Sequence, residues 1–187
     1  PSLVSKTPTC LFLEEPPLKI EASFACAEKG DECGDSHMLR LLNGGKYIAT
    51  LSDGMGTGHR ANRESSAIIS LLEDFMNAGF DKTVAVKLIN SVMVMKSAAE
   101  AFATVDMCMV DLYTGEAEFI KNGAEPSYIK RKQNTETVRS SSLPVGILSG
   151  LEIETFAHTL KDGDMVIMAS DGISLRGESG NWLRSAI

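Results

Sequence analysis

Three aspartates stand beside glycine where the chain enters or leaves a strand-like segment. Gly34–Asp35 ends a polar loop, Ser52–Asp53–Gly54 follows the apolar run 47–51, and Ser170–Asp171–Gly172 follows the apolar run 165–169. An aspartate at a strand end presents its carboxylate at the rim of a sheet, and the adjacent glycine lets the backbone turn away. Carboxylates that meet at one rim repel each other unless a cation neutralises them. A cation site is therefore one explanation of the pattern.

Oxygen-only ligands favour hard ions such as Mg²⁺ or Mn²⁺ over zinc. The competing explanation is structural, because Ser-Asp-Gly is a common strand-to-turn tripeptide in which the aspartate closes an Asx-turn. That explanation is the better one for either copy alone. Two copies and the Gly-Asp pair bring the two explanations level, so spacing alone leaves both open.

Gly54, Gly56 and Gly58 separate Asp53 from a helix-like segment. The pattern is G-x-G-x-G, without the spacing of a dinucleotide-binding loop or the lysine of a P-loop. The hairpin expected before it is also wrong for a βαβ unit, so nucleotide binding is disfavoured. We hypothesise that Gly56 and Gly58 form a regulatory hinge, through which the helices at 60–97 control the placement of Asp53. The alternative is a fixed helix pair that covers a sheet.

The elements around this loop follow from turn residues and periodicity. The Asn-Gly-Gly turn at 43–45 predicts a hairpin that brings Asp35 and Asp53 to the same end of a sheet. Two helices are expected next, over 60–78 and after a cap at Asp81. The predicted apolar faces comprise Ile68, Leu71, Leu72, Phe75 and Met76 in the first helix, and Ala85, Leu88, Ile89, Val92 and Met95 in the second.

Residues 18–27 alternate like a strand, and from about residue 102 the apolar period is again two. Further strands are expected within 102–112, 115–123, 126–131, 135–140, 152–160 and 164–170, and the start of another helix at 181–187. This order predicts an α+β fold in which two antiparallel sheets pack as a sandwich with helices outside.

The length, charge and composition of the chain limit its possible functions. With 187 residues, the chain fits one domain with a sizeable core. A formal charge of −7 argues against nucleic-acid binding, which needs a basic surface. No apolar run approaches the ~20 residues of a membrane span. The four cysteines show no CxxC spacing, so a reducing cytoplasm fits best.

Five motifs appear in order: GDECGDSH, SDGMGTGHRANRES, NGAEPSYIKR, LPVGI and GDMVIMASDGI. Together they resemble the type-2C metal-dependent Ser/Thr protein phosphatases, and most of all the catalytic domain of the stage II sporulation protein E branch. The resemblance covers residues 20–187 and leaves 1–19 as an N-terminal extension or boundary segment. It implies two antiparallel sheets in αββα layers.

The resemblance also implies a mechanism and partners. Asp35, Asp53, the Gly54 carbonyl and Asp171 would hold Mn²⁺ or Mg²⁺, with two ions in the complete domain. Asp35 and Asp53 would act through a metal-activated water that attacks phosphorus. The substrate would be the phosphoserine of an anti-anti-sigma factor, whose dephosphorylation activates a sporulation sigma factor. The resemblance further implies a homodimer formed through the helices at 60–97. It also implies that this domain is the cytoplasmic part of a membrane-anchored parent protein.

Several positions depart from the family pattern. No C-terminal Asp-Asp-Met-Thr-like strand is present, so the domain looks truncated and short of one ligand. Met55 occupies the place where eukaryotic relatives carry a histidine, and Ala124 the place of an acid used by some relatives. The alternative function is therefore an inactive or degenerate phosphatase fragment that binds a partner.

Overall fold

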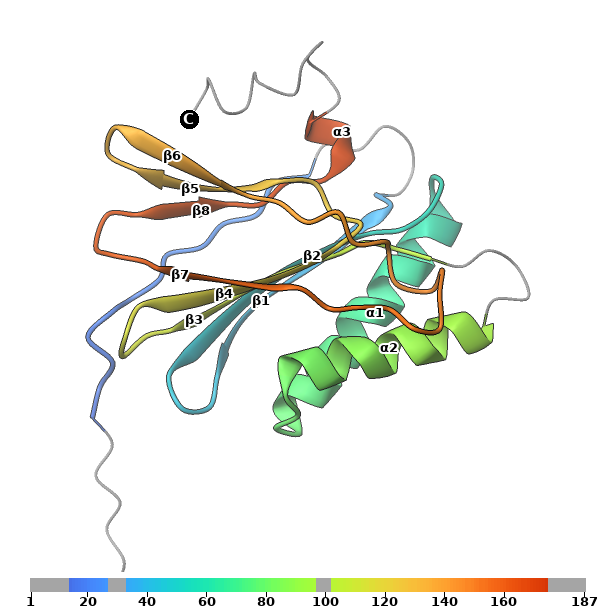
Figure 1. Ribbon diagram of the computed structural model, residues 1–187, viewed down its shortest axis with the longest axis horizontal. Helices are drawn as coiled ribbons and strands as arrows, with labels where there is room; N and C mark the ends of the chain where they lie inside the picture. The colour runs from blue at the N-terminus through green and yellow to red at the C-terminus, as the bar shows by residue number, and fades with distance from the viewer. Residues whose placement is uncertain (1–13, 27–32, 97–101, 175–187) are drawn as a thin grey trace, which may run out of the picture.

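The computed structural model describes residues 14–26, 33–96 and 102–174. Two antiparallel sheets pack face to face, and two helices cover the outer face of the larger sheet (Figure 1). The five-stranded sheet has the order β1 (Asp35–Leu42), β2 (Lys46–Asp53), β3 (Val105–Asp111), β4 (Glu116–Asn122) and β7 (Thr155–Thr159). The three-stranded sheet has the order β6 (Asn134–Val138), β5 (Ser127–Arg131) and β8 (Met165–Ile167). The predicted fold class is confirmed.

The hairpin forms where the Asn-Gly-Gly turn predicted it. Gly44 and Gly45 adopt φ of 76° and 70°, values that glycine reaches without a Cβ clash. In the resulting register Asp35 lies directly opposite Asp53. Opposed residues of an antiparallel pair have side chains on the same face, so both carboxylates leave the sheet on one side.

Helices α1 (His59–Asn77) and α2 (Lys82–Lys96) pack on the five-stranded sheet over a common apolar core. The cap at Asp81 is present, because its Oδ1 accepts from the N–H groups of Thr83 at 2.9 Å and Val84 at 3.2 Å. In α1 the predicted face is the packed one. In α2 the predicted face is only partly right: Ala85 and Ile89 are buried, but Leu88 and Met95 are exposed, and the buried set is completed by Val86, Asn90 and Met93. Apolar residues occupy most positions around α2 itself, so the helical period is compatible with two overlapping apolar faces.

The strand expected over residues 18–27 is wrong for the described part, since residues 18–26 form no strand. Pro16 and Pro17 lack N–H donors, which disfavours a continuous ladder. The alternation instead serves packing. Leu18 and Ile20 lie against the core between the two sheets, and the Leu18 N–H donates to the Leu112 carbonyl at 3.2 Å.

The remaining predicted strands are all present as β3 to β8, each shorter than its apolar segment. The described chain ends with α3 (Asp171–Ser174), and the helix expected at 181–187 lies outside the described residues. Over the described ranges, we find no helix with the length and apolar character that crossing a membrane requires.

Candidate metal centre

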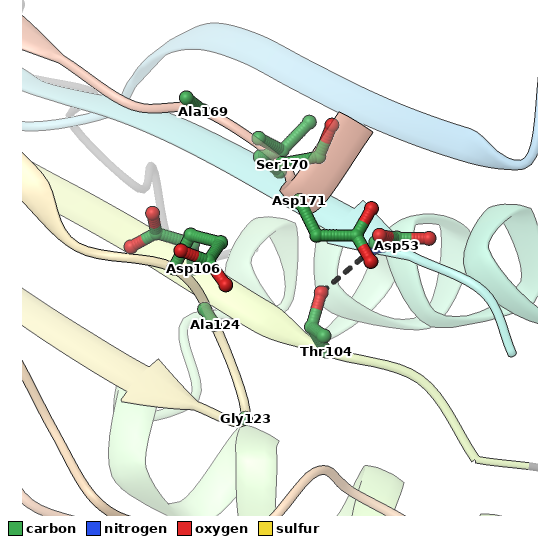
Figure 2. A pocket seen from close by; sticks show the side chains of 10 residues that line it. Asp53, Thr104, Asp106, Gly123, Ala124, Ala169, Ser170 and Asp171 are labelled. Carbon is green, nitrogen blue, oxygen red and sulfur yellow. Dashed lines mark hydrogen bonds between the residues drawn. The ribbon is translucent and has the colours of Figure 1, made fainter. Parts of the chain in front are cut away.

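The three predicted aspartates come together where the ends of the two sheets meet. Asp35 begins β1 and Asp53 ends β2, while Asp171 follows β8 of the other sheet as the first residue of α3. The Asp53 and Asp171 side chains lie next to each other in Figure 2, in hydrogen-bonding contact. Residues separated by up to 136 positions in the chain therefore share one site.

The electrostatics of Asp53 report this crowding directly. Burial, the negative charges of Asp35 and Asp171, and hydrogen bonding with both carboxyls together raise the pKa of Asp53 from 3.8 to about 7. Carboxylates that share a site hold a proton, because like charges so close disfavour full ionisation. A divalent cation in the same place would remove that penalty.

The backbone at Asp53 is held by the segment that precedes β3. The Asp53 N–H donates to Thr104 Oγ1 at 2.8 Å, and the Thr104 N–H donates to the Asp53 carbonyl at 2.9 Å (Figure 2). Ser52 Oγ donates to the Thr104 carbonyl at 2.7 Å. These three bonds fix the end of β2, and with it the direction of the Asp53 side chain.

Asp35 has a partner from the second sheet. Ser170 Oγ donates to Asp35 Oδ2 at 2.6 Å, a short bond typical of a hydroxyl on a carboxylate. The Gly54 N–H also donates to the Gly34 carbonyl at 3.3 Å, which links the turn after β2 to the residue before Asp35. Ser170 thus ties Asp35 to the segment after β8 that carries Asp171.

Glycine is needed at the three positions after Asp53 for two different structural reasons. A Cβ on Gly54 would lie 1.9 Å from the Ala61 carbonyl oxygen, so the start of α1 packs where any side chain would stand. Gly56 and Gly58 adopt φ of 95° and 68° with open space around them, and Gly58 is the N-cap of α1. Close approach requires the first glycine, and backbone conformation favours the other two.

A small pocket of about 120 Å³ lies beside the cluster. Its lining residues are Leu51, Asp53, Thr104, Asp106, Gly123, Ala124, Glu125, Ala169, Ser170 and Asp171. Asp35 and Gly54 are not among them: Asp35 reaches the site through Asp53, and Gly54 faces α1.

Sequence reasoning missed Asp106, Thr104 and Glu125, and gave Ser170 no role in the site. Asp106 was detectable as an acid flanked on both sides by apolar residues inside the strand VDMCMVDL.

Asp106 is buried against a cation under the pocket. Lys121 Nζ lies 2.7 Å from Asp106 Oδ1, and Ser127 Oγ donates to Asp106 Oδ2 at 2.8 Å. Burial raises the pKa of Asp106 and lowers that of Lys121, and the contact between the two charges opposes both shifts. Ser127 belongs to β5, so this cluster joins the two sheets beneath the pocket.

The donor set is chemically suited to a hard divalent cation. Within residues 14–26, 33–96 and 102–174, no group of three or more His, Cys, Asp or Glu side chains converges as a site that could hold a metal ion. The aspartates instead interact in pairs through Asp53. Such pairwise contacts suit Mg²⁺, which is usually held by one or two carboxylates and keeps several waters.

Residues 43–186 match the family model for stage II sporulation protein E. Stage II sporulation protein E from Bacillus subtilis (strain 168) is 40% identical over 152 residues, and that from Priestia megaterium is 38% identical over 156 residues. The matches cover 81% and 82% of this chain, but only 18% and 27% of those relatives' length.

Among solved structures, the chain is similar to the PP2C phosphatase domain with a fragment of the regulatory domain of SpoIIE from Bacillus subtilis. The TM-score is 0.74 at 38% identity, over 82% of this chain and 46% of that one. Sequence motifs, fold and family model agree, so the chain belongs to the stage II sporulation protein E family.

Proposed function

We propose that the chain carries a metal-dependent phosphoserine phosphatase site whose ligands are Asp35, Asp53, the Gly54 carbonyl and Asp171. The observation that carries the proposal is the convergence of three carboxyl groups: Asp35 lies opposite Asp53 in the strand register, and Asp53 is in hydrogen-bonding contact with both Asp35 and Asp171, which with burial raises its pKa. When bound, Mn²⁺ or Mg²⁺ would supply charge neutralisation for a phosphoryl group and lower the pKa of a water molecule.

The chain's own residues have separate roles in this proposal. Asp53 interacts with both Asp35 and Asp171, and Thr104 orients Asp53 through its backbone N–H. Ser170 orients Asp35 by its hydroxyl hydrogen bond. Lys121 keeps one further acid, Asp106, paired beneath the pocket, which limits the negative charge that an incoming phosphate meets.

We also propose the wider context. Residues 20–187 form the phosphatase domain, and the substrate is a phosphorylated anti-anti-sigma factor whose dephosphorylation activates a sporulation sigma factor. Gly56 and Gly58 act as a regulatory hinge between Asp53 and α1, with φ values that other residues adopt with strain. Exposed Leu88 and Met95 on α2 support a homodimer through the helices. The parent protein is membrane-anchored, with this domain in the cytoplasm.

Hydrolysis of p-nitrophenyl phosphate and of a phosphoserine protein, each titrated with MnCl₂, tests the proposal. We expect Mn²⁺-dependent turnover that disappears in Asp53→Asn and persists in Asp162→Asn, a control on an exposed aspartate between β7 and β8 that does not line the pocket. Turnover that survives in Asp53→Asn would contradict the site assignment.

A second function is a partner-binding module without turnover. The absence of a converged three-ligand cluster within the described ranges favours it. This alternative predicts that a phosphorylated anti-anti-sigma factor binds with equal affinity in MnCl₂ and in EDTA, and is never dephosphorylated. Binding that depends on Mn²⁺ would exclude it.

A further inference from the structure

The motif LPVGI at 143–147 has no ligand in the proposed site, yet the segment around it contacts two walls of the pocket. On one side, Val145 and Ala103 exchange two backbone hydrogen bonds, at 3.0 and 3.2 Å. On the other side, the Gly123 N–H donates to the Ser142 carbonyl at 2.8 Å. Segment 142–148 therefore lies against both the residue before Thr104 and a residue that lines the pocket.

The contact with Gly123 is close as well as hydrogen-bonded. A Cβ on Gly123 would lie 2.3 Å from Pro144 Cγ. Gly123 and Ala124 form the wall opposite Asp171 in Figure 2. The position of Pro144 thus sets how far this wall can retreat from the aspartates.

The contact with Ala103 leads to the aspartates through the backbone. Ala103 bridges both Val145 and Gly54. The residues on either side of Ala103 make hydrogen bonds to the end of β2 and the turn after it. The Met55 N–H donates to the Phe102 carbonyl at 3.2 Å, and Thr104 holds Asp53 as described above. Segment 142–148, residues 102–104 and residues 53–55 therefore form three hydrogen-bonded layers.

One side chain anchors the outermost layer. Asn90 is 2% exposed on the buried face of α2. Its Nδ2 donates to the Leu148 carbonyl at 2.8 Å, and its Oδ1 accepts from the Gly146 N–H at 2.8 Å. Because a buried amide is costly without partners, an asparagine with both ends bonded to one segment fixes that segment in both directions.

We infer that Asn90 is a positioning residue, which holds segment 142–148 so that this segment sets the pocket wall at Gly123 and the backbone that carries Asp53. The inference rests on the proposed function only in taking this pocket as the phosphatase site. These contacts connect α2 to Asp53 through segment 142–148 and residues 102–104, without involving the glycine loop 54–58.

Amide hydrogen exchange tests the route without any metal. In Asn90→Leu, the Gly146 N–H and Leu148 carbonyl lose their partner, which should speed exchange at Val145, Thr104 and Asp53 by about 10-fold or more. The amide of Ile129, in the other sheet, reports global opening, and Ser91→Ala is the control for a side-chain hydrogen bond on the exposed face of α2.

Equal exchange in Asn90→Leu and the parent chain, or acceleration no greater than at Ile129, would overturn the inference. If Asn90→Leu does not fold, Asn90→Asp decides by the same criterion, because it keeps an acceptor for Gly146 and loses the donor to Leu148.

Manganese binding provides the functional measurement. Calorimetric titration should show Mn²⁺ affinity weakened about 10-fold in Asn90→Leu, a loss typical of residues that support metal ligands, and unchanged in Ser91→Ala. A purely structural role would lower the melting temperature with no change in Mn²⁺ affinity, which would also overturn the inference. A parent chain that binds Mn²⁺ but hydrolyses no phosphate ester would refute the proposed function and leave this positioning role standing.

Discussion

Replacing Asp53 by asparagine should stabilise the metal-free chain and remove its function. The carboxyl group is crowded by Asp35 and Asp171, and its pKa rises from 3.8 to about 7. At about 1.4 kcal/mol for each pKa unit, the shift corresponds to roughly 4 kcal/mol at most. Asp53 is only half-buried, so solvent screening reduces this to about 1 to 2 kcal/mol.

The sign of the effect follows from proton linkage. A folded-state pKa above the unfolded value gives stability that is fully present below the unfolded pKa and is lost as the pH rises through about 7. Asparagine does not titrate. Asp53→Asn and the parent chain should therefore have similar stability near pH 4, and the variant should be more stable by about 1 to 2 kcal/mol at pH 8.

Urea unfolding in EDTA at pH 4.5, 6, 7 and 8 measures the difference, with Asp162→Asn as the matched control. The same variants should be tested for Mn²⁺ binding, which Asp53→Asn is expected to lose. If Asp53→Asn were less stable than the parent chain at pH 8, or if the difference did not change with pH, the three carboxylates would not be in electrostatic contact.

Three further outcomes follow from the site. Mn²⁺ must displace the proton on Asp53, so calorimetry in buffers of different ionisation enthalpy should show proton release at pH 6 that disappears above pH 8; equal release at both would contradict the raised pKa. Gly54→Ala should force the start of α1 to move, at a cost of about 1 to 3 kcal/mol in urea unfolding, and should weaken Mn²⁺ binding. Gly150→Ala, which adds a methyl group in open space, should do neither. Lys121→Met should lose about 3 to 5 kcal/mol by leaving Asp106 buried without its cation, and the double variant Asp106→Leu/Lys121→Met should recover most of that. A double variant as unstable as the single one would argue against charge as the cause.

The proximity of Asp35 and Asp53 was predictable because local rules determine it. Asn-Gly-Gly fixes the turn, the turn fixes the register, and the register places the two residues opposite each other. The approach of Asp171 depends instead on how the two sheets pack. Spacing along the chain carries no such information: the repeated Ser-Asp-Gly pattern left a cation site and a structural turn equally open, and the family resemblance then indicated the site.

The buried face of α2 shows why periodicity alone was insufficient. Valine, leucine, isoleucine or methionine occupies most positions between Val84 and Met95, so two stripes offer similar apolar area. Asn90 decides between them, since its amide has partners on segment 142–148. An asparagine in an apolar helix is usually assigned to the solvent side, which here selects the wrong stripe.

The buried charges of β3 and β4 form a pair. Asp106 and Lys121 are cross-strand partners in the register and both are buried, whereas the other charged residues of these strands, Asp111, Glu116 and Glu118, are half-buried or exposed. A buried acid and a buried cation each carry a desolvation cost that only the other offsets. In VDMCMVDL and EFIKNG, Asp106 and Lys121 are therefore evidence for strand pairing as well as for the pocket floor. An acid and a base within consecutive apolar strands are a signal that the amino-acid sequence itself carries, and here that signal leads to Asp106 and the inner wall of the site.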